Sequence, residues 1–224
     1  MINFAQLCYC IYYENYYNSF IMKNKKNNFY LMGVVFIAIL GGLLFGYDTA
    51  VISGAAQALQ KHLGLDAFWH GVTASSALIG CVIGSAFSGY FASGLGRRNS
   101  LRLAALLFFL SALGSYYPEF LFFSKGDTSF ALILAFNFYR IIGGIGVGLA
   151  SAVCPMYIAE IAPSEIRGKL VSCNQFAIIF GMLVVYFVNY MIKDGMPDEV
   201  LVSDGWRYMF GSEAVPAALF CIFL

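Results

Sequence analysis

Six apolar stretches, most of them about as long as a helix that crosses a bilayer, constrain the fold of this chain more than any other feature. Such a helix needs roughly 20 mainly apolar residues. The six stretches cover residues 29–56, 68–91, 101–117, 130–161, 170–192 and 208–224. Hydrophobic residues make up 60% of the sequence and charged residues 11%, which leaves too little polar surface for a soluble domain. The sequence therefore predicts an all-α, multi-pass integral membrane protein.

The basic residues indicate how the chain is oriented in the membrane. Eight of the basic side chains fall before the first stretch, around the junction of the second and third, or between the fourth and fifth: Lys23, Lys25, Lys26, Arg97, Arg98, Arg102, Arg167 and Lys169. The loops on the other side carry fewer basic residues and more acidic ones. Because cytoplasmic loops are enriched in lysine and arginine, we expect a cytoplasmic N-terminus in an inner or plasma membrane protein.

Two regions follow from this pattern, a cytoplasmic segment at 1–28 and a six-helix transmembrane bundle at 29–224. Residues 1–21 are rich in Tyr and Asn and lack the basic start and cleavage site of a signal peptide. We expect native translation to begin at Met22, so that 1–21 is not native. The sixth stretch runs to the end of the sequence, and we expect a truncated sixth helix.

Small residues recur every fourth position in three of the stretches. The series are Gly42, Gly46, Ala50 and Gly54; Ser76, Gly80, Gly84 and Ser88; and Gly144, Gly148 and Ala152. Small residues at this spacing lie on one face of a helix and let backbones approach closely inside a membrane. The spans are therefore expected to form a tight bundle.

The sequence offers nothing that points to an enzyme, a metal centre or a nucleic-acid partner. Six cysteines are scattered without a C-x-x-C pair, and the glycine-rich run 143–148 lies inside a span without the register of a nucleotide loop. No nucleophile with a base is apparent. With a net charge of +1, no nucleic acid is expected to bind, and no cofactor or metal is expected.

Four ionisable residues within the spans are candidates for function: Asp48, Arg140, Glu160 and Glu213. A charge at the centre of a membrane helix costs roughly 2.5–3.5 kcal/mol, so these groups should pair or face a cavity. Asp48 and Arg140 form the natural pair, either as a proton switch or as a static ion pair that fixes helix register. Glu160 is expected in a cytoplasmic charge network near Arg167, and Glu213 could be a boundary residue.

Two further side chains suit a ligand rich in hydroxyl groups. Gln175 shares a helical face with Ile178, Ile179 and Met182, which predicts an amide well inside the bundle. An interhelical hydrogen bond is the alternative use of this amide. Phe45 could stack on the apolar face of a sugar, or it could simply fill the core.

Four segments carry a resemblance to a known family: "GGLLFGYDTAVISGA" at 41–55, "GLGRR" at 94–98, the block 139–181, and "DGWRYMFGSEAVPA" at 204–217. They resemble the sugar porters of the major facilitator superfamily, and among them the bacterial D-xylose–proton symporters. The resemblance covers residues from about 34 to 224 and only the first of two six-helix halves. It implies a sugar site between the halves and alternating access by rocking.

The resemblance also implies roles for individual residues. Asp48, Arg140 and Glu213 match the proton-coupling residues, with the proton as coupling ion, while Gln175 and Phe45 match the sugar-binding ones. The cytoplasmic charge network of the family corresponds to Glu160, Arg167, Arg97 and Arg98. Three positions depart from the family pattern. Ser93 and Gly94 stand where an acidic or amide residue and a basic residue are usual, and Met182 stands where relatives can carry glutamine.

The expected function is therefore proton-coupled monosaccharide symport, with D-xylose or a related pentose or hexose as substrate. The expected partners are the sugar, membrane lipid and the missing C-terminal six-helix half. A sugar uniporter or polyol symporter of the same family is an alternative, as is a truncated membrane protein or sugar sensor without transport activity.

Overall fold

The computed structural model describes residues 25–121, 130–197 and 200–224. The chain divides into two compact units, residues 1–36 and 37–224. Of the first unit, residues 25–36 are described, and they are helical. The expectations for 1–21 and Met22 lie outside the described residues. The paragraphs below concern the second unit.

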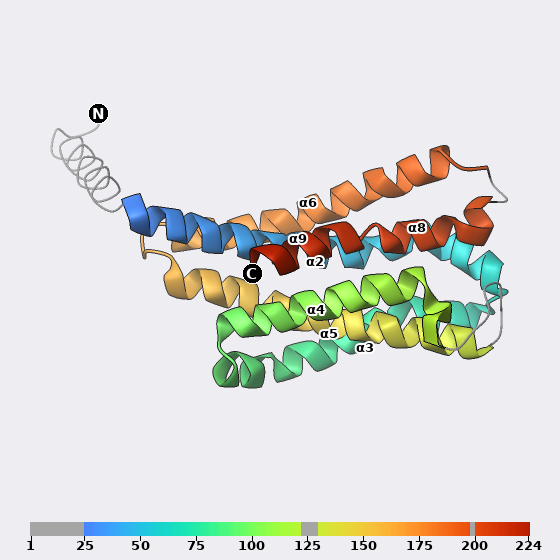
Figure 1. Ribbon diagram of the computed structural model, residues 1–224, viewed down its shortest axis with the longest axis horizontal. Coiled ribbons are helices and arrows are strands. Elements are labelled where there is room, and N and C mark those ends of the chain that lie inside the picture. The colour runs from blue at the N-terminus through green and yellow to red at the C-terminus, as the bar shows by residue number, and fades with distance from the viewer. Residues whose placement is uncertain (1–24, 122–129, 198–199) are drawn as a thin grey trace, which may run out of the picture. The chain divides into compact units, whose positions relative to one another are not determined.

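The long elements in the described residues are all helical, as the sequence predicts (Figure 1). They are α2 (Lys25–Leu63), α3 (Ala67–Gly94), α4 (Arg97–Tyr116), α5 (Phe130–Ile161) and α6 (Arg167–Asp194). Within the described residues, these five helices are long and apolar enough to cross a membrane. A short 3-10 helix, η1 (Pro118–Leu121), follows α4.

The sixth span begins earlier than predicted and is not one continuous helix. A π-helical turn, η2 (Leu201–Gly205), leads into α8 (Trp206–Gly211), and α9 (Ala214–Phe223) follows a turn at Ser212 and Glu213. Pro216 has no N–H to donate to the carbonyl of Ser212, and the Val215 N–H bonds that oxygen instead, at 3.3 Å. This proline explains why the regular helix is interrupted beside Glu213.

The early start of the sixth span rests on a buried ion pair that the sequence did not indicate. The Arg207 guanidinium donates to both carboxylate oxygens of Glu119 in η1, and the Nη1–Oε2 distance is 2.7 Å. It also lies 4.7 Å from the ring centroid of Trp206. Because its charge is neutralised in this way, Arg207 can be buried within the helical segment.

Two seams of small residues hold the helices together. On α3, Gly80 and Gly84 lie against the backbone of α5, and Gly144 and Gly148 of α5 lie against the backbone of α3. At these four positions an added Cβ would collide with backbone atoms of the opposite helix. In the other seam, Gly46 of α2 lies against the backbone carbonyl of Ile178 on α6. Both seams use the four-residue spacing seen in the sequence.

Large apolar side chains gather in two separate clusters. One contains Leu44, Phe108, Val153, Ile158 and Phe220, and the other contains Val51, Leu59, Phe136, Trp206 and Phe210, each with further members. On α5 the residues between Phe136 of the second cluster and Val147 of the first include Arg140. On the sixth span, those between Phe210 and Ala217 include Glu213. A buried polar layer thus separates the two apolar clusters.

Candidate functional site

Asp48 of α2 and Arg140 of α5 form an ion pair in this polar layer. Arg140 Nη1 donates a hydrogen bond to Asp48 Oδ1, and Nη2 lies 3.5 Å from the backbone oxygen of Asp48. Only 1% of Asp48 and 2% of Arg140 is exposed, so the pair is shielded from solvent within the second unit. The structure therefore brings together the two charges that the sequence singled out.

Glu213 completes the cluster from the sixth span. It lies at the turn between α8 and α9, where it is 1% exposed, and it interacts electrostatically with both Asp48 and Arg140. Its Oε1 atom has no hydrogen-bond partner among the described residues. Glu213 is therefore a core residue, and the alternative reading as a boundary residue is wrong.

Aromatic side chains lie near the ion pair, one of them directly over the guanidinium. The Cζ atom of Arg140 lies 5.1 Å from the ring centroid of Phe210, and Phe136 meets Phe210 edge to face at 5.2 Å. The phenol of Tyr47 lies 2.7 Å from the hydroxyl of Ser212, the residue before Glu213. Sequence analysis missed these neighbours. The one available signal was that Tyr47 and Ser212 directly precede the two acids.

The charges of the cluster do not cancel when both acids are ionised. Two carboxylates share one guanidinium in a region lined by apolar side chains, so one negative charge is left in excess. A single proton removes that excess, because the two carboxylates then carry one negative charge beside one guanidinium. Chemically, the cluster is suited to taking up and releasing a proton.

The two predicted ligand-binding residues lie outside this cluster. Phe45 on α2 is half-buried and packs against the apolar cluster that contains Leu44. Gln175 on α6 is exposed, so its amide does not lie inside the described bundle as predicted. The reason is geometric: α6 buries the face with Asn174, Ile178 and Gly181, and successive helical positions are about 100° apart. Ile179, predicted on the face of Gln175, is also exposed.

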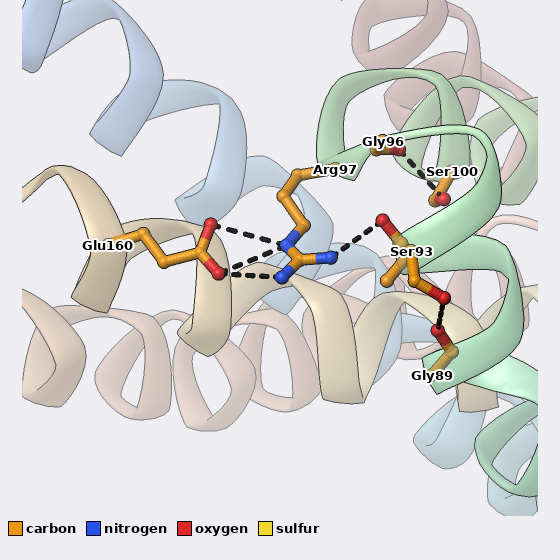
Figure 2. Close-up of polar contacts among 7 residues, drawn as sticks. Gly89, Ser93, Gly96, Arg97, Ser100 and Glu160 are labelled. Atoms are coloured by element: carbon orange, nitrogen blue, oxygen red, sulfur yellow. Dashed lines mark hydrogen bonds and ion pairs between the residues drawn. The ribbon is translucent and has the colours of Figure 1, made fainter.

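The predicted cytoplasmic charge network is present in part (Figure 2). Arg97, at the start of α4, binds the Glu160 carboxylate through Nε and Nη2, and the shortest distance is 2.8 Å between Nη2 and Oε1. Its Nη1 donates to the backbone oxygen of Ala92 in the last turn of α3, at 2.6 Å. Arg97 therefore places positive charge at the C-terminal ends of both α3 and α5, where the helix dipoles favour a cation.

The other predicted members of the network do not join this pair. Arg98 Nε donates to the Leu224 backbone oxygen at 2.9 Å, and Arg167 Nη2 lies 3.5 Å from the Ala162 oxygen. In the described part of the chain, Arg167 forms no ion pair with Glu160 or Glu165. The carboxylate of Glu165 accepts from Ser164 instead, and hydrogen bonds from its own backbone and from that hydroxyl lower the pKa of Glu165.

Among the described residues, no group of three or more potential metal ligands lies close enough to hold a metal ion. The polar layer contains two acids and an arginine, and the ion pair in Figure 2 contains one acid and one arginine. Neither grouping resembles a metal site.

Comparison with known proteins places this arrangement in a family. The profile of the family described as "Sugar (and other) transporter" matches residues 34–224. The chain belongs to this sugar transporter family. It is 52% identical over 217 residues to the D-xylose-proton symporter of Escherichia coli. This alignment covers 91% of this chain and 44% of the symporter. The glucose transport protein of Synechocystis is 41% identical, in an alignment that covers 84% of this chain and 39% of the Synechocystis protein.

Solved structures agree with the family assignment. The chain matches the major facilitator superfamily proton:xylose symporter XylE bound to 6-bromo-6-deoxy-D-glucose with a TM-score of 0.82 and 51% identity, over 88% of this chain and 44% of that one. The inward open conformation of XylE from E. coli matches with a TM-score of 0.80, over 86% of this chain and 47% of the XylE chain. These relatives are transporters rather than enzymes. The chain spans less than half the length of the relatives it matches.

Proposed function

We propose that this chain is the N-terminal six-helix half of a proton-coupled monosaccharide symporter, with D-xylose or a related pentose or hexose as its substrate. The observation that carries the proposal is the buried cluster of Asp48, Arg140 and Glu213 between two apolar clusters. A buried acid with an exchangeable proton next to a cation is the chemistry that proton coupling needs. Support for the substrate class comes from the 52% identity to a protein named D-xylose-proton symporter.

In the proposed mechanism, Asp48 takes up a proton from the outside and its interaction with Arg140 weakens. The bundle then rocks relative to a second six-helix half, so that the sugar site opens to the other side. No resident cofactor is required, since the proton itself is the coupling ion. Arg97 and Glu160 would hold the cytoplasmic ends of the helices together in one of the two states.

The exposed face of α6 fits this proposal. Gln175 and Ile179 lie exposed on α6. The apolar segments of α6 and α3 are less buried than those of the other three long spans. In a complete symporter we expect the second half to cover α3 and α6. Gln175 would then donate to sugar hydroxyls from the α6 face, and Phe45 would pack against the sugar ring.

The proposed orientation places the N-terminus and the Arg97–Glu160 pair on the cytoplasmic side of an inner or plasma membrane. Support for it comes from the basic residues in the loops at that end of the bundle, following the positive-inside rule.

The coupling role can be tested by Asp48→Asn in a complete transporter. We suggest joining residues 34–224 to the C-terminal half of the E. coli D-xylose-proton symporter, to which this chain is 52% identical. In proteoliposomes, Asp48→Asn should abolish xylose accumulation driven by a pH gradient while sparing exchange of labelled xylose. Accumulation that survives the substitution would rule out coupling through Asp48. A matched control is Asp66→Asn, which changes an exposed aspartate before α3.

A further inference from the structure

A pair of hydroxyl groups, one buried on Tyr47 and one half-buried on Ser212, connects α2 to the turn that carries Glu213. Tyr47 is 3% exposed, and its hydroxyl lies 2.7 Å from Ser212 Oγ. The two residues are separated by 165 positions in the sequence, so the contact joins the first span to the sixth. Each of them directly precedes one of the two acids in the cluster.

The direction of this hydrogen bond follows from the neighbouring contact. Ser212 Oγ also lies 2.6 Å from the backbone oxygen of Met209, and a carbonyl oxygen can only accept. The single proton of the serine hydroxyl therefore goes to Met209. Tyr47 must then donate to Ser212, which gives a directed chain from the phenol through the serine to the α8 backbone.

The turn held by this hydrogen-bond chain is only partly regular. The Ser212 N–H still bonds to the Tyr208 oxygen at 2.9 Å and the Ala217 N–H to the Glu213 oxygen at 3.1 Å, but two N–H groups between them do not follow the α-helical pattern. The Glu213 N–H bonds to the Phe210 oxygen at 3.2 Å and the Val215 N–H to the Ser212 oxygen at 3.3 Å, both over three residues. Pro216 cannot restore the missing bond. The position of Glu213 therefore depends in part on tertiary contacts. The hydrogen bond from the Tyr47 hydroxyl to Ser212, the residue before Glu213, is one such contact and has a defined direction.

We propose that Tyr47 is a positioning residue, which holds Ser212 and thereby sets the distance of the Glu213 carboxylate from Asp48 and Arg140. The proposal rests on the proposed function, because it assigns Tyr47 to the same proton-handling cluster. The charged and titratable groups that face Glu213 in the described structure are Asp48 and Tyr47 of α2 and Arg140 of α5. Tyr47 itself carries no proton to substrate in this scheme.

The test is an infrared titration of the 224-residue chain in lipid nanodiscs, without sugar. Protonated carboxyl groups give a separate C=O stretching band, and the band that Glu213→Gln removes is assigned to Glu213. In Tyr47→Phe and in Ser212→Ala, we expect that band to change frequency and its midpoint to move by about half a pH unit or more, roughly threefold in proton affinity. The double variant should move it no further than either single one.

Tyr139→Phe is the matched control, since Tyr139 is half-buried on α5 and its ring packs on Gly114. It should leave the Glu213 band unchanged. Circular dichroism and size-exclusion chromatography establish that each variant is folded. The proposal is overturned if the band and its midpoint are unchanged in whichever of the two single variants folds, or if Glu213→Gln removes no band at any pH. None of these measurements needs transport, so such a failure leaves the proposed function standing.

Discussion

At the scale of single residues, the central feature is an arginine that stabilises two acids in an apolar region. Arg140 is 2% exposed and its charge is matched by Asp48, while Glu213 lies nearby without a hydrogen-bond partner for Oε1 in the described structure. Burying a charge is costly unless it is paired, and removing one partner of a buried pair leaves the other uncompensated.

Arg140→Gln should therefore destabilise the folded chain strongly. The substitution leaves two carboxylates buried without a cation, and we expect the free energy of unfolding at neutral pH to fall by about 3–5 kcal/mol. Denaturant unfolding in detergent micelles measures this loss. Adding Asp48→Asn to Arg140→Gln should recover part of it. A change of less than about 1 kcal/mol in the single variant would contradict the ion-pair account.

The sequence could predict part of this site for a clear physical reason. Few charges fall inside the spans, so Asp48 and Arg140 had few other possible partners. The exposure of Gln175 was not predictable in the same way, because helical periodicity shows which residues share a face but not which face a neighbouring helix covers. The contact between Tyr47 and Ser212 depends on the interrupted sixth span, which single-residue patterns did not reveal.

At the scale of elements, close helix contacts depend on glycine at specific positions. On α3, a Cβ added at Gly84 would collide with the backbone oxygen of Ile145 on α5, whereas a Cβ added at Gly89 would meet nothing within 4 Å. The two positions lie on the same helix but on different faces. They therefore separate the effect of packing from that of helix propensity.

Gly84→Ala should destabilise the chain and Gly89→Ala should not. Overpacking a close contact costs about 1–3 kcal/mol, while alanine in place of an exposed helical glycine stabilises by up to about 1 kcal/mol. Thermal unfolding of both variants in the same detergent gives the comparison. Equal stability of the two variants would show that α3 and α5 are not held by this seam.

The ion pair between Glu119 and Arg207 predicts a dependence on pH. Burial favours the protonated acid, but the hydrogen bonds from Arg207 and from the backbone, together with the charge of Arg207, outweigh burial and lower the pKa of Glu119. Because the folded-state pKa lies below the unfolded value of about 4.3, the stabilising contribution is complete above that pH and is lost as the pH falls through the folded-state value.

Glu119→Gln tests this contribution. The free energy of unfolding of the wild type should exceed that of Glu119→Gln at pH 7, and the difference should shrink as the pH is lowered below about 4. Denaturant unfolding of both proteins across this range measures the difference. A difference that stays constant down to about pH 3 would contradict the assignment to the ionised Glu119.

The element scale also shows where sequence patterns were sufficient. The 130–161 stretch coincides with α5, and the four-residue glycine series correctly marked the packed faces of α3 and α5. The predicted start of the sixth span was too late, because the charge of Arg207 was taken to indicate a loop. The interruption of this span was not predicted either. Glu119 neutralises Arg207 from a distant segment, and that pairing is a tertiary contact that hydropathy along the chain does not reveal.

At the scale of the whole molecule, the chain belongs to the sugar transporter family and spans less than half the length of the relatives it matches. Family membership rests on the profile match over residues 34–224 and on relatives such as the E. coli D-xylose-proton symporter, which is 52% identical. In the proposed function, the polar layer connects this chain to coupled transport because its carboxylates exchange a proton. Under the same proposal, a second half covers the exposed faces of α3 and α6.

The central claim is that sugar and protons move together through a transporter containing this half. The most direct measurement is the pH of a lightly buffered, energy-depleted cell suspension expressing residues 34–224 joined to the C-terminal half of the E. coli symporter. On addition of D-xylose, the account predicts alkalinisation of the medium as protons enter with the sugar, and no alkalinisation in Asp48→Asn. Entry of labelled D-xylose into the unsubstituted fusion without any alkalinisation would contradict it.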